Sequence, residues 1–187
     1  MPVYKAEGIV LRRHAIGEAD RTITLFTREY GKLRAVARGT RRTASRLGGR
    51  VEPFTYARFL LARGRSLDVI AQVEVIRSFS GLRSELLRSA YASYVAELVD
   101  RFLPERDRQD DVFALILDVL GALEHSGEDE VEVQTLWFAL RLASDLGYRP
   151  EVEACVACGR ALPQDAAGPV RAWGFNPALG GALCPEC

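Results

Sequence analysis

The sequence has little of what catalysis by side chains usually requires. It contains only two histidines, His14 and His125, which lie far apart in the chain and are expected on the surface. No group of residues typical of nucleophilic catalysis accompanies them. No glycine-rich phosphate-binding fingerprint follows a predicted strand and opens a predicted helix. We therefore expect a protein that is not an enzyme.

Long hydrophobic runs are also absent. The longest apolar stretch, FALILDVLGAL, is interrupted by Asp118, so no segment is expected to span a bilayer. The first residues, MPVYKAEG, contain no apolar signal segment. Together these absences predict a cytoplasmic protein. The apolar content of 48% is nevertheless enough for a packed core, in one ordinary domain or two small ones.

Net charge is absent only when it is summed over the whole chain. The formal net charge is zero, yet residues 1–80 carry 16 Lys and Arg against 7 Asp and Glu, whereas residues 81–187 carry 9 against 18. Such asymmetry between halves is typical of a protein in which one half meets a polyanion.

The basic half reads as five short strands, expected at residues 4–13, 20–27, 32–38, 53–63 and 66–79. Five strands in about 80 residues favour an OB-fold barrel, with an SH3-like barrel as the main alternative. In the third strand, KLRAVAR, alternation places small apolar residues on one face and cations on the other. We expect that second face to be exposed and positive.

The cations of this half gather on consecutive strands and on the loop from Gly39 to Arg50, which has no apolar periodicity. Aromatic side chains lie among them and are candidates for stacking on unpaired bases, namely Phe26, Tyr30, Phe54 and Tyr56. The candidate nucleic-acid-binding residues are Arg12, Arg13, Lys32, Arg34, Arg38, Arg41, Arg42, Arg46 and Arg50.

The hydrophobic period changes to that of helices after residue 80. Helices are expected from Leu82 to about Phe102, over residues 110–125 with Asp110 as the cap, and over residues 129–146. In the last of these, we expect Val133, Leu136, Trp137, Leu140 and Ala143 to face the core of a small bundle.

All four cysteines lie near the C-terminus, in the pairs Cys155-Val-Ala-Cys158 and Cys184-Pro-Glu-Cys187, separated by 25 residues. Two such pairs can supply four thiolates to a tetrahedral Zn²⁺ site. Four thiolates leave no open coordination position, which argues against a metal-dependent hydrolase. A redox disulfide is the alternative, but the expected βαβ context is missing. The pattern predicts one structural zinc ion.

The order of several separated segments resembles a known family. The runs EGIVLR, GEADRTITLFTREYGKLRAVARGTRR and SRLGGRVEPFT, followed by LGYRPEVEACVACG and GGALCPEC, are similar to the bacterial DNA repair protein RecO family over the whole chain. The resemblance implies an α+β multidomain protein with an OB-fold at 1–80, a helical domain at 81–150 and, at 151–187, a zinc finger with four cysteine ligands that is attached to the helical domain.

The resemblance also implies a recombination mediator associated with the nucleoid. Such a protein binds single- and double-stranded DNA, anneals complementary strands, and works with RecR to load RecA onto strands coated by single-stranded DNA-binding protein. Members of the family usually continue beyond a position such as Cys187, so a truncated chain is expected. The alternative function is an RNA- or protein-binding barrel with a zinc ribbon, from the transcription or translation machinery.

Overall fold

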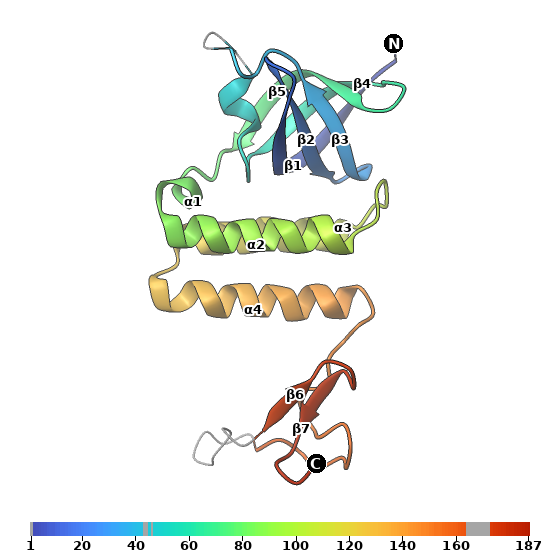
Figure 1. Cartoon of the computed structure of the whole chain (residues 1–187), viewed down its shortest axis with the longest axis vertical. Helices are drawn as coiled ribbons and strands as arrows, with labels where there is room; N and C mark the ends of the chain where they lie inside the picture. Colours follow the sequence, from blue (N-terminus) through green and yellow to red (C-terminus); the bar gives the residue numbers. More distant parts are fainter. Residues whose placement is uncertain (1, 43–44, 46, 164–172) are drawn as a thin grey trace. The chain divides into compact units, whose positions relative to one another are not determined.

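Five strands form a closed barrel in the N-terminal part of the chain (Figure 1). The barrel order is β1-β2-β3-β5-β4, and β1 pairs with β4 to close it. The predicted five-stranded, OB-like barrel is therefore confirmed. The strands are β1 (Val3–Ile16), β2 (Asp20–Thr27), β3 (Gly31–Ala37), β4 (Tyr56–Ala62) and β5 (Asp68–Arg77).

The structure is a computed structural model, which describes residues 2–42, 45, 47–163 and 173–187. The chain divides into two units, Met1–Phe138 and Ala139–Cys187, and each is considered by itself below. The domain boundaries expected from the sequence, near residues 80 and 150, stay a prediction.

The two strand pairings that close the barrel, β1 with β4 and β3 with β5, differ in length. β1 and β4 pair antiparallel over seven positions, from Val3 opposite Ala62 to Ile9 opposite Tyr56. β3 and β5 pair parallel at only two positions, Ala35 with Asp68 and Val36 with Val69. Between Ala37 and β4 the chain forms a short 3-10 helix, η1 (Gly48–Val51), whose Val51 is buried in the barrel core.

β2 is buried on both faces. Ile23 and Leu25 enter the barrel core as the alternation predicts. Phe26 points to the other side and is also fully buried, because its ring packs against Phe113 with 5.7 Å between centroids. The outer face of this strand is thus covered by α3 at Phe26, whereas Asp20, Arg21 and Thr22 at its start stay partly exposed.

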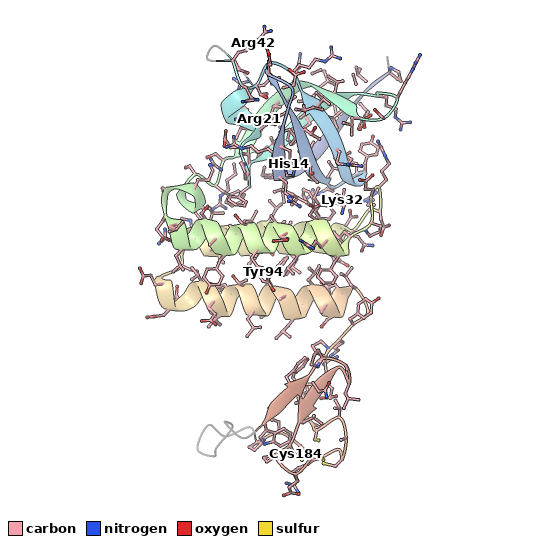
Figure 2. All side chains as sticks on the ribbon, in the orientation of Figure 1. His14, Arg21, Lys32, Arg42, Tyr94 and Cys184 are labelled. Atoms are coloured by element: carbon pink, nitrogen blue, oxygen red, sulfur yellow. The ribbon has the colours of Figure 1, made fainter. Side chains whose placement is uncertain are left out.

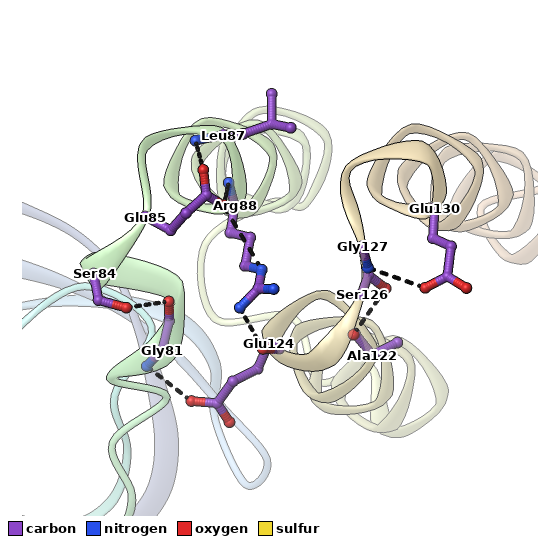
Figure 3. Close-up of polar contacts among 10 residues, drawn as sticks. All are labelled: Gly81, Ser84, Glu85, Leu87, Arg88, Ala122, Glu124, Ser126, Gly127 and Glu130. Atoms are coloured by element: carbon purple, nitrogen blue, oxygen red, sulfur yellow. Dashed lines mark hydrogen bonds and ion pairs between the residues drawn. The ribbon is translucent and has the colours of Figure 1, made fainter.

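Four helices follow the barrel: α1 (Gly81–Ser84), α2 (Leu86–Phe102), α3 (Asp110–His125) and α4 (Glu128–Asp145). The prediction of one continuous helix from Leu82 was wrong, because the chain breaks at Glu85. Figure 3 shows the reason: the Glu85 carboxylate accepts hydrogen bonds from the backbone N–H groups of Leu87 and Arg88, at 2.9 and 3.1 Å. Such a side-chain cap begins a new helix.

The start of α3 also differs from the prediction. The N-cap residue is Gln109, which makes no side-chain capping bond, and Asp110 is the first residue of the helix. Its carboxylate instead pairs with Arg108, at 2.6 Å. An acidic residue in this first turn still interacts favourably with the helix dipole.

In α4 the predicted core face was wrong. Val133, Leu136 and Trp137 are each more than half exposed, whereas Val131, Thr135 and Phe138 are buried. The helix carries two apolar stripes, and hydrophobic periodicity alone cannot decide which of them packs. No helix among the described residues is long and apolar enough to cross a membrane.

A short linker between α2 and α3, residues 103–109, packs against the turn between β2 and β3. Gly31 has a positive φ of 63°, and a Cβ atom there would lie 1.9 Å from the carbonyl oxygen of Asp107. The backbone N–H of Arg106 donates to the carbonyl of Lys32 at 2.7 Å. Only glycine permits this close approach.

The unit Ala139–Cys187 contains a small hairpin of β6 (Gly174–Asn176) and β7 (Gly181–Leu183). The segment around Glu151 and Val156 binds to it, since Ala182 N–H donates to the Glu151 carbonyl and Val156 N–H to the Ala182 carbonyl. These bonds bring the two cysteine pairs to one end of the hairpin segment.

Candidate nucleic-acid interface and metal centre

The structure separates the predicted basic residues into two groups, and the first group is engaged with carboxylates. Arg12 and Lys32 converge on Asp100 of α2, with N–O distances of 3.0 and 3.4 Å. The Lys32 ammonium also donates to the backbone carbonyl of Asp100, and its side chain is only 11% exposed. Lys32 therefore joins the barrel to α2.

Arg34 and Arg13 have carboxylate partners as well. Arg34 pairs with Glu105 of the 103–109 linker at 3.0 Å. Arg13 pairs with Glu52, to which Arg21 also lies at 3.9 Å. The expectation that the cationic face of β3 is wholly exposed was wrong at Lys32, because α2 and the linker cover this part of the strand.

The second group lies on and beside the basic loop. Arg38, Arg41, Arg42 and Arg50 are all exposed, and none lies within ion-pair distance of a carboxylate among the described residues. Arg41 donates to the carbonyl of Gly17 at 2.9 Å and Arg50 to that of Val73 at 3.2 Å. Arg42 lies at the end of the barrel opposite Lys32 (Figure 2). Arg46 lies outside the described residues.

The four candidate stacking aromatics are already engaged. Phe26 and Phe54 are buried. The Tyr30 ring packs edge-on against Tyr4 with 4.8 Å between centroids, and the Tyr56 hydroxyl donates to Glu7 at 2.8 Å. Phe26 and Phe54 are therefore closed to bases, whereas Tyr30 and Tyr56 remain partly exposed.

Sequence reasoning missed the carboxylates that form ion pairs with the first group of cations. Asp100 lies 68 and 88 positions after Lys32 and Arg12 in the chain, and no local pattern marks it or Glu105. The only signal in the sequence was the acidic excess of the second half, which matches the basic excess of the first.

The four cysteines form the second candidate site. Their Sγ atoms all lie within 4.8 Å of one another, and those of Cys158 and Cys184 are 3.7 Å apart. Cys155 and Cys184 are buried, whereas Cys158 and Cys187 are exposed. Two CxxC turns thus bring four thiols together as the spacing predicted, and the set could hold a metal ion.

The local hydrogen bonds also suit a cation. Backbone N–H groups of Cys184, Cys158 and Ala157 lower the pKa of Cys155 to about 6. Hydrogen bonds from the Cys187 thiol to Cys184 and Cys158 raise its own pKa to about 12. Four thiols this close cannot all ionise unless a positive ion balances their charge, which is what a metal supplies.

A closed five-stranded barrel with a basic loop, followed by helices and a four-cysteine cluster, defines an OB-like protein with a segment that could hold a metal ion. The family description "Recombination protein O N terminal" matches residues 1–79, and "Recombination protein O C terminal" matches residues 83–187. The chain belongs to the RecO family of DNA repair proteins, which confirms the resemblance seen in the sequence.

Relatives in this family support the assignment along the whole chain. It is 45% identical to the DNA repair protein RecO of Symbiobacterium thermophilum, over 100% of this chain and 72% of the relative. It is 46% identical to that of Pelotomaculum thermopropionicum, over 100% of this chain and 69% of the relative. The protein of Desulforudis audaxviator is 42% identical over 100% and 71%.

Proposed function

We propose that this protein is a recombination mediator that works on DNA without breaking or forming covalent bonds. It binds single- and double-stranded DNA, anneals complementary strands, and acts with RecR to load RecA onto strands coated by single-stranded DNA-binding protein. The family membership supports this activity, and the proposed place of work is the nucleoid.

The observation that carries the proposal is the exposed cation group Arg38, Arg41, Arg42 and Arg50. Free guanidinium groups on one loop can each contact a phosphate, whereas those already paired with carboxylates cannot do so without losing a partner. Contacts to phosphates carry no sequence information. Two strands held in this way are joined or released according to their own complementarity, which is annealing.

The test is a salt series on single-stranded DNA with the double variant Arg41→Gln/Arg42→Gln. Each lost phosphate contact lowers the slope of log affinity against log salt by about 0.7, so we expect a fall of about 1.4. The matched control is Arg101→Gln/Arg108→Gln, which removes two exposed cations that are paired with carboxylates. Equal slopes for both double variants would contradict the proposal.

The mediator activity needs its own measurement. Strand annealing is followed with and without single-stranded DNA-binding protein, and RecR is then added. We expect annealing of bare strands, and loading of RecA on coated strands only when RecR is present. Stronger binding to folded RNA than to single-stranded DNA, without annealing, would instead favour a module of the transcription or translation machinery.

For the cysteine cluster, we propose one structural Zn²⁺ ion held by Cys155, Cys158, Cys184 and Cys187. A tetrahedron with Zn–S bonds of about 2.3 Å has sulfur–sulfur edges of about 3.8 Å, close to the 3.7 Å between Cys158 and Cys184. With four protein thiolates the ion has no open position for a substrate. Its role is to stabilise the segment that carries it.

A further inference from the structure

A second cationic surface lies on the outer face of β4 and β5, and it borders the predicted interface at Arg50. It is a groove of about 530 Å³, lined at its rim by Lys5, Arg50 and Arg58. Of these three, only Arg50 belongs to the residues predicted from the sequence. The cations come from β1, η1 and β4, so the fold, and not a local run, brings them together.

Strand register arranges the groove in two rows. Leu60 of β4 lies opposite Lys5 of β1 on one side and opposite Gln72 of β5 on the other. In the next row, Arg58 lies opposite Glu7 and Glu74. Directly opposite residues project on the same face of a sheet. The first row therefore presents a cation, an apolar surface and an amide side by side.

The groove continues the basic loop. Leu47 and Arg50, from the end of that loop, form part of the wall. The Arg50 guanidinium donates to the carbonyl of Val73 on β5 at 3.2 Å, which fixes the end of the loop beside the groove. Arg42 is separated from Leu47 by only four residues of the chain.

The carboxylates near Arg58 have different effects. Glu7 accepts from Arg58 Nε at 2.9 Å and from the Tyr56 hydroxyl at 2.8 Å, and these bonds lower the pKa of Glu7. Glu7 thus holds the guanidinium through Nε and leaves its two terminal nitrogens without a hydrogen bond to Glu7. Glu74 lies 3.7 Å from one of them, in a pair whose side chains are 57% and 74% exposed. An exposed pair of this kind contributes little, so a phosphate can displace Glu74.

We propose that this groove binds single-stranded DNA that has passed over the basic loop. Lys5, Arg50 and Arg58 contact phosphates, and bases lie against the apolar surface of Leu60 and Leu47. The volume of the groove is that of a small ligand, which suits one or two nucleotides of a single strand and not a duplex. This inference rests on the proposed DNA-binding function and adds a second contact surface to it.

The test uses the full chain and an oligothymidylate of about 16 nucleotides, long enough to cover both surfaces. Lys5→Gln should weaken binding about fivefold at low salt and lower the salt slope by about 0.7. The matched control, Arg101→Gln, removes an exposed cation of α2 that is paired with Glu97, and it should change neither. Glu74→Gln removes the competing carboxylate and should strengthen binding, because repulsion of a phosphate is lost.

Two outcomes separate this inference from the proposed function. If Lys5→Gln and Glu74→Gln bind like the control while Arg41→Gln/Arg42→Gln binds more weakly, the groove is not used and the loop still is. If the unmodified chain does not bind the oligonucleotide, both proposals fail. Lys5 and Glu74 are exposed, so both variants should fold, and circular dichroism checks this.

Discussion

Asp100 determines what two cations of the barrel can do. Its carboxylate lies between Arg12 and Lys32, and its own backbone carbonyl accepts from Lys32. A nearly buried ammonium that loses its partners carries a desolvation cost that an exposed cation does not. The cations of this barrel therefore divide into those with a structural role and those left exposed for the proposed DNA binding.

The first prediction compares Lys32→Gln with Arg38→Gln. We expect Lys32→Gln to lower the free energy of unfolding by about 1–2 kcal/mol, because Asp100 keeps only Arg12 as a partner. Arg38→Gln should change stability by less than about 0.5 kcal/mol, since exposed sites tolerate substitution, but it should weaken DNA binding. Urea denaturation and DNA titration of both variants give the four values. Weaker DNA binding by Lys32→Gln without loss of stability would contradict the structural role.

Residue roles could be predicted where the signal is local. The four-cysteine cluster follows from two CxxC pairs, because the spacing itself forms the tight turn that gathers the thiols. The division of the cations into paired and free could not be predicted. The partner of Lys32 lies 68 positions further along the chain, and only the folded topology brings it near.

Among the elements, strands were easier to predict than helices. Alternation in β2 and β3 marked the barrel core correctly at Ile23, Leu25 and Leu33. In α2, by contrast, the buried residues are Ala92, Val95, Ala96 and Val99, whereas the large apolar or aromatic side chains of Leu86, Tyr94 and Phe102 are exposed. A helix with apolar residues on several sides leaves the packed face undetermined until its neighbours are known.

The second prediction tests which face of α4 is buried. Leu136 is 60% exposed and Leu120 of α3 is fully buried. Leu120→Ala should lower the free energy of unfolding by about 2–5 kcal/mol, because it leaves a cavity. Leu136→Ala should change it by less than about 0.5 kcal/mol. Urea denaturation measures both. A large loss for Leu136→Ala would mean that the outward stripe of α4 is covered in solution.

At the scale of the whole molecule, part of the charge asymmetry between residues 1–80 and residues 81–187 serves to hold the fold together. Carboxylates of the acidic half, Asp100 and Glu105, pair with barrel cations within the unit Met1–Phe138. Arg77 of β5 and Glu124 of α3 add a further pair at 2.9 Å. Some of the barrel cations therefore hold the barrel to the helices and their linker through ion pairs. Only the remaining cations are available for a polyanion.

The third prediction concerns the zinc ion that we propose for the cysteine cluster. Removal of the ion by a chelator should unfold the segment around β6 and β7, because four thiols without a cation repel one another when ionised. The barrel, whose core contains none of the cysteines, should keep its structure. Hydrogen exchange measured before and after chelation follows each part, and elemental analysis verifies the loss of zinc. The variant Cys158→Ser is expected to behave like the chelated protein, and full protection of β7 without metal would contradict the structural role.

The order of the barrel strands has a consequence for the synthesis of the chain. The barrel closes through the pairing of β1 with β4 and of β3 with β5. Neither pairing can form until the second half of the barrel has been translated. Until then, the apolar faces of β2 and β3 lack Phe59, Leu61 and Ile70, against which they pack in the finished core. A nascent chain on the ribosome thus exposes a hydrophobic three-stranded meander, and completion of β5 ends that exposure.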